Sequence, residues 1–121
     1  HPYVNPAVRK NPEPFHKSAE ELLSRTRRQM LEQGYGSWQT LVCESLVRAS
    51  VVRYLRANHG DSVAEREIEL QKELGWKWIR GLSDTLEQYE RQRGTYSNFE
   101  QYLPVLVKFF DQYVEGSRPS R

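Results

Sequence analysis

A chain of 121 residues favours one domain, or part of one, over two, because single domains cluster near about 100–150 residues. Its 18 basic and 16 acidic side chains leave a net charge of +2, too small for the many phosphate contacts of nucleic-acid binding. The single cysteine, Cys43, excludes an intrachain disulfide, and the longest uncharged run, Gln33 to Cys43, is too short to cross a membrane.

Residues 1–16 are predicted to form a proline-rich, extended strap. Four of the six prolines fall in this segment, at Pro2, Pro6, Pro12 and Pro14. Each proline lacks an amide donor and biases the residue before it away from the helical region.

From Ser18 onward the apolar residues follow a helical period. Ser18 and Glu21 have the spacing of a capping box, so a first helix is expected from Ser18 to the stop at Gly34. Ser37 is expected to cap a second helix, over residues 37–58, which is apolar nearly all round and therefore central in the bundle.

Three more helices follow with short connections. The pattern predicts them over residues 61–74, from about Trp78 to Gly94, and over 97–116, where Ser97 and Glu100 repeat the capping-box spacing. Pro104 is expected to kink or restart the last helix. No alternating β pattern of useful length appears, so the predicted class is all-α, with about five helices.

The domain organisation follows from these boundaries. The strap spans residues 1–16, a helical bundle spans residues 17–115, and a disordered polar tail spans residues 116–121.

Glu44 stands out in the central helix. At 100° per residue, Leu55 lies about 20°, Arg48 about 40° and Val51 about 340° around the helix from it, so the carboxylate sits inside an apolar arc. A buried carboxylate costs several kcal/mol unless a cation, a metal or several donors meet it. Two interpretations remain: an i, i+4 ion pair with Arg48, and a functional carboxylate.

The other candidates fit ordinary structural roles at least as well. Tyr35, between Gly34 and Gly36, is either a catalytic hydroxyl or part of a helix-stop corner. Trp76 and Trp78 are predicted to be core residues rather than a stacking platform.

Several runs resemble a bacterial family of uncharacterised domains that look like zinc-dependent metallopeptidases, often in secreted or periplasmic proteins. The resemblance covers residues 1 to about 115. It is carried by His1-Pro2-Tyr3-Val4-Asn5-Pro6, Gln33-Gly34-Tyr35-Gly36-Ser37-Trp38, Glu44-Ser45-Leu46-Val47-Arg48-Ala49 and Tyr89-Glu90-Arg91.

The resemblance implies a division of roles. His1 corresponds to the second histidine of an HExxH zinc motif, whose first histidine and general-base glutamate would lie upstream. Glu44 corresponds to the third zinc ligand, Arg48 to the residue that orients it, and Tyr35 to a hydrogen-bond donor for the oxyanion. The full-length protein is then expected to bind zinc and a peptide or protein substrate.

This chain by itself is expected to be inactive and to bind zinc weakly, because His1 and Glu44 supply only two ligands and no general base. The alternative is a non-catalytic helical module for protein–protein interaction or structure, with Glu44 and Arg48 as a buried pair. Nucleic-acid binding through Arg25, Arg27 and Arg28 is disfavoured by the small net charge.

Overall fold

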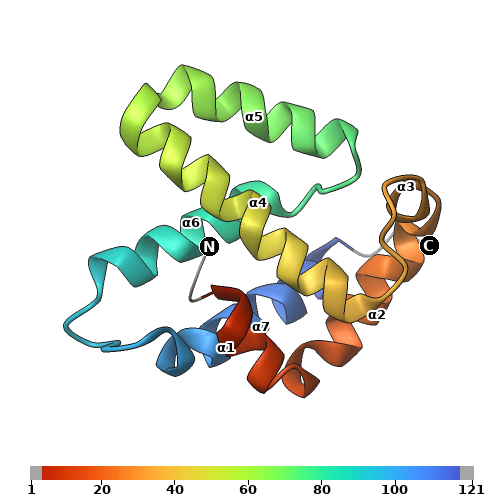
Figure 1. Cartoon of the computed structure of the whole chain (residues 1–121), viewed down its shortest axis with the longest axis horizontal. Coiled ribbons are helices and arrows are strands. Elements are labelled where there is room, and N and C mark those ends of the chain that lie inside the picture. The colour runs from red at the N-terminus through yellow and green to blue at the C-terminus, as the bar shows by residue number, and fades with distance from the viewer. Residues whose placement is uncertain (1–3, 118–121) are drawn as a thin grey trace.

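The computed structural model describes residues 4–117, and every regular element in that span is helical (Figure 1). The elements, in chain order, are α1 (Val4–Lys10), the 3₁₀ helix η1 (Glu13–Phe15), α2 (His16–Arg25), α3 (Arg27–Glu32), α4 (Trp38–His59), α5 (Asp61–Glu73), α6 (Ile79–Arg91) and α7 (Phe99–Gly116). The predicted all-α class is confirmed.

Helix α4 is the centre of the fold, as predicted. The Ser37 hydroxyl accepts a hydrogen bond from the Thr40 amide at 3.2 Å and so caps the helix, while Gly60, at a positive φ of 93°, ends it. Helices α1, α2, α5 and α6 all pack against α4. Figure 1 shows α5 running back along α4 as the second arm of a helical hairpin.

The core lies between α4 and the helices around it. Trp76 and Trp78 are 0% and 2% exposed, so their prediction as core residues is confirmed. The Trp78 indole donates to the Ser45 hydroxyl at 2.9 Å, and that hydroxyl donates to the Leu41 carbonyl at 2.6 Å. These bonds satisfy the polar atoms of Trp78 and Ser45 in the core and so offset the cost of their desolvation.

The prediction of an extended strap is wrong for the part of residues 1–16 that the structure describes. Residues 4–10 form α1, and residues 13–15 form η1. Pro6 lies in the first turn of α1, where the amide that proline lacks has no intrahelical acceptor. The prolines therefore cost these short helices little.

The predicted first helix is also wrong in its start and continuity. It begins at His16 instead of Ser18 and breaks at Thr26 into α2 and α3. Ser18 is not a cap: it is buried inside α2, and its hydroxyl donates to Asp111 of α7. With α1 and this break, residues 4–117 contain seven α-helices instead of about five.

The last helix has a different cap from the one predicted. Asn98, not Ser97, accepts the Gln101 amide, at 2.9 Å, and α7 begins at Phe99. The helix runs through Pro104 as one element, so the proline does not restart it. Gly116 still belongs to α7, whereas residues 118–121 of the predicted tail lie outside the described residues.

Ion pairs fasten α5 to its two neighbours. Glu65 of α5 accepts hydrogen bonds from Arg56 of α4 at 2.9 Å and from Arg80 of α6 at 2.8 and 2.5 Å. The two bonds from Arg80, and after them the bond from Arg56, lower the pKa of Glu65 from 4.5 to about 2.

This shift predicts a pH dependence. The folded pKa of Glu65 lies below its ordinary value, so its stabilising effect is full above about pH 4.5 and is lost as the pH falls toward 2. Urea unfolding between pH 7 and pH 2 should show a smaller loss of stability in Glu65→Gln than in the wild type. Glu73→Gln, at an exposed position of the same helix, should behave like the wild type. A Glu65→Gln profile parallel to that of the wild type would contradict this assignment.

Candidate functional site

Tyr35 lies in the turn that connects α3 to α4. Gly34 has a positive φ of 90°, and the Tyr35 amide donates to the Met30 carbonyl at 2.8 Å, as in a helix-stop corner. The Tyr35 ring packs edge-on against Trp76, with centroids 5.7 Å apart. The turn therefore holds the phenol against the core, beside the first half of α4.

Glu44 projects from α4 next to this turn and is half-buried, with 26% of its side chain exposed. Its Oε1 lies 3.2 Å from Nε of Arg48, one turn later. The i, i+4 ion pair that the spacing predicted is thus present. The arc around Glu44 is less buried than expected, because Val51 is 44% exposed and the carboxylate lies at the edge of the core.

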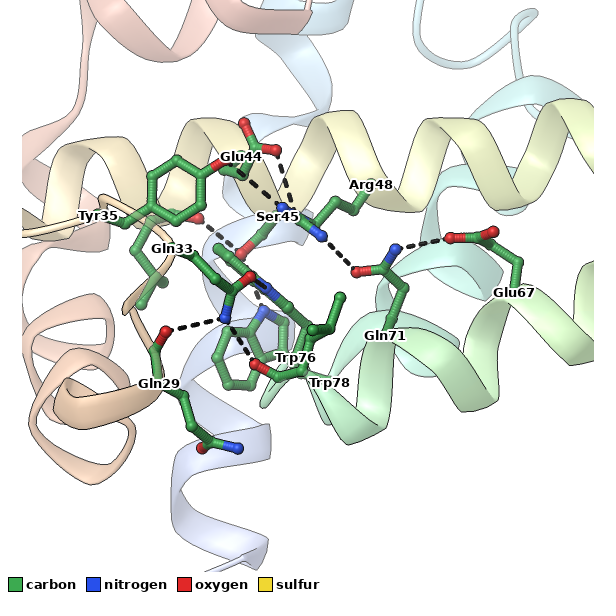
Figure 2. A network of polar contacts seen from close by, with 12 residues as sticks. Gln29, Gln33, Tyr35, Glu44, Ser45, Arg48, Glu67, Gln71, Trp76 and Trp78 are labelled. Carbon is green, nitrogen blue, oxygen red and sulfur yellow. Dashed lines mark hydrogen bonds and ion pairs between the residues drawn. The ribbon is translucent and has the colours of Figure 1, made fainter. Parts of the chain in front are cut away.

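Arg48 is held on several sides (Figure 2). Its guanidinium lies over the Trp76 ring, 4.6 Å from the centroid, in a cation–π contact. Nη1 donates to Oε1 of Gln71 at 2.7 Å, and Nη2 donates to the Tyr35 hydroxyl at 3.5 Å. Only 18% of the side chain is exposed. The buried Nε makes no hydrogen bond and faces Glu44 as an ion-pair partner only.

Two glutamines complete this network, and the sequence interpretation missed both. Gln71 of α5 is 6% exposed and donates to Glu67 at 2.6 Å while it accepts from Arg48. Gln33 accepts from the Trp76 indole at 3.0 Å and donates to the Leu74 carbonyl at 2.8 Å. Gln71 continues the buried stripe that Ala64 and Ile68 form on α5. This helical spacing is the sequence signal that could have identified Gln71 as a buried residue.

His1, the other predicted metal ligand, lies outside the described residues. The helix that follows it, α1, packs against α4. Arg9 of α1 lies near the thiol of Cys43, the residue before Glu44, and its positive charge acts on the pKa of that thiol. Burial raises the pKa of Cys43, and the positive charge of Arg9 opposes this rise. The chain near its N-terminus therefore contacts α4 at the turn that carries Glu44.

The described residues do not make a complete metal site. Within residues 4–117, no group of three or more His, Cys, Asp or Glu side chains is placed to hold a metal ion. A zinc site needs four ligands, of which at least three come from the protein. Among the described residues, Glu44 has an ion-pair partner in Arg48, at 3.2 Å, and belongs to no such group.

A family model described as "Domain of unknown function (DUF4932)" matches residues 1–109. Neither the curated proteins nor the solved structures contain a significant match. In residues 4–117, no helix has the length and apolar character needed to cross a membrane, in agreement with the sequence analysis.

Proposed function

Because the chain belongs to the DUF4932 family of domains of unknown function, we propose its role from the surroundings of Glu44. The chain is the C-terminal helical part of a zinc-dependent, metallopeptidase-like domain. Glu44 contributes one carboxylate ligand, His1 contributes an imidazole, and an upstream histidine and glutamate of an HExxH motif supply the remaining ligand and the general base.

The observation that carries this proposal is the orientation of Glu44. Arg48 contacts Oε1 of the carboxylate, so Oε2 can bind a metal without loss of the ion pair. Arg48 is itself fixed by Gln71 and by stacking on Trp76. Ligand carboxylates in metal sites are oriented by such outer partners, whose loss weakens metal binding about 10–100-fold.

In this proposal, the residues of the chain orient the zinc ligand Glu44 and bind the substrate. Zinc, when bound, activates a water molecule for peptide hydrolysis. Arg48 holds the carboxylate of Glu44 in place and, through Nη2, the hydroxyl of Tyr35. That hydroxyl is the donor we assign to the substrate's oxyanion. We assign the general base to the upstream glutamate of the HExxH motif.

Zinc affinity in a longer form of the protein, extended upstream of His1, tests the proposal. We expect Glu44→Gln to weaken zinc binding at least about 100-fold and Arg48→Met to weaken it about tenfold, measured by competition with a chelator. Glu90→Gln is the matched control, because Glu90 is exposed on α6 and pairs with Arg53 instead. If Glu44→Gln binds zinc with wild-type affinity, Glu44 is not a zinc ligand.

The residues immediately before His1 give a second check. The proposal requires a histidine four positions before His1 and a glutamate three positions before it. Any other residues there would overturn the assignment as a metallopeptidase.

One observation favours a second candidate, a non-catalytic interaction or structural module. The ion pair between Glu44 and Arg48 already satisfies the carboxylate without a metal. Under this alternative, Glu44→Gln lowers stability and leaves zinc binding unchanged.

A further inference from the structure

A cavity of about 360 Å³ lies between α1, η1 and α7, away from the Glu44 network. Its walls are mostly apolar: Ala7, Pro14, Phe15, Leu103, Pro104 and Val107 line it. The volume falls at the lower end of the roughly 300–1,000 Å³ range of small-molecule sites.

The rim of the cavity carries two opposite charges. Nζ of Lys10 lies 3.6 Å from Oε1 of Glu100, and both residues line the cavity. Their side chains are 77% and 59% exposed, so this ion pair is weak and opens easily. A ligand with adjacent opposite charges can separate this pair, because its positive group can bind Glu100 while its negative group binds Lys10.

Pro104 interrupts the helical hydrogen bonds of α7 at the same wall. It lies inside α7 and has no amide hydrogen, so the Glu100 carbonyl, four residues earlier, lacks its usual helical donor. Both residues line the cavity. The negative side of the rim therefore offers the Glu100 carboxylate to an incoming N–H donor.

We propose that this cavity binds a free amino acid with a large apolar side chain. The ligand's ammonium group binds Glu100, its carboxylate binds Lys10, and its side chain packs against Phe15, Leu103 and Val107. Such an amino acid carries adjacent opposite charges next to an apolar body, which matches the rim and the walls. The proposal is independent of the role of Glu44.

Titration calorimetry of the 121-residue chain tests this proposal with defined probes. L-phenylalanine or L-leucine should bind saturably, and glycine should not. N-acetylphenylalanine, which lacks the ammonium, and phenylalaninamide, which lacks the carboxylate, should each bind at least tenfold more weakly than phenylalanine. Glu100→Gln and Lys10→Gln should weaken phenylalanine binding to a similar degree.

Matched variants separate the charge contacts from general effects. Lys10→Gln should leave the weaker binding of phenylalaninamide unchanged, because that probe has no carboxylate for Lys10. Lys17→Gln and Glu20→Gln, exposed on α2 and outside the lining, should bind phenylalanine like the wild type. The proposal is overturned if neither phenylalanine nor leucine binds, or if phenylalanine and its two derivatives bind equally.

Discussion

Replacing Trp78 with alanine is expected to lower the free energy of unfolding by about 3–5 kcal/mol. The side chain is 2% exposed and packs edge-on against Trp76 and Tyr113, with centroids 5.7 and 6.1 Å away. Alanine would leave a cavity where the chain joins α5 to α6, against the middle of α4. The lost bond to Ser45 adds to this cost.

Urea unfolding at pH 7 measures the effect, and neighbouring substitutions control it. Lys77→Ala, exposed and adjacent in sequence, should change the unfolding free energy by less than about 0.5 kcal/mol. Ser45→Ala should cost about 1–3 kcal/mol, because it leaves the buried indole N–H without an acceptor. A Trp78→Ala protein within about 1 kcal/mol of the wild type would contradict this view of the core.

Replacing Arg48 with leucine is expected to cost about 2–4 kcal/mol of stability. The substitution removes the stacking on Trp76 and leaves the buried Oε1 of Gln71 without its donor. Glu44 loses its ion pair as well, but it is 26% exposed and can be hydrated. The cost therefore arises mainly at Gln71 and Trp76.

A double-mutant cycle with Gln71→Leu isolates that contact. We expect a coupling energy of about 1–3 kcal/mol between Arg48→Leu and Gln71→Leu, because the double variant leaves neither buried partner unsatisfied. Arg28→Leu is the control, since that side chain is 92% exposed and should change stability little. Strict additivity of the two substitutions would show that the Arg48–Gln71 contact contributes nothing.

Local signals predicted much of the helical framework. Ser37 marked the start of α4 because its cap depends only on neighbouring residues, and Gly60 marked the end for the same reason. The same logic failed at Ser18, whose hydroxyl bonds to Asp111, 93 residues away. The prolines were misread because their effect depends on where each helix begins, and Pro6 falls in a first turn.

The candidate site was predictable only where it is local. The Glu44–Arg48 pair follows from i, i+4 spacing on one helix. The contacts of Arg48 with Gln71 and Trp76 arise because α5 folds back on α4 and the following turn inserts its tryptophans, which no short-range pattern specifies. Helical angle placed Val51 in the apolar arc around Glu44, yet its side chain is 44% exposed, because the angle alone does not say which face the neighbouring helices cover.

A crystal structure of the longer protein grown with zinc, with anomalous data collected at the zinc edge, tests the central claim most directly. Our account predicts a zinc ion about 2.0–2.2 Å from a carboxylate oxygen of Glu44, with Arg48 still in contact with that carboxylate. A zinc ion bound without Glu44, or a Glu44 that pairs only with Arg48 in a zinc-saturated protein, would contradict it.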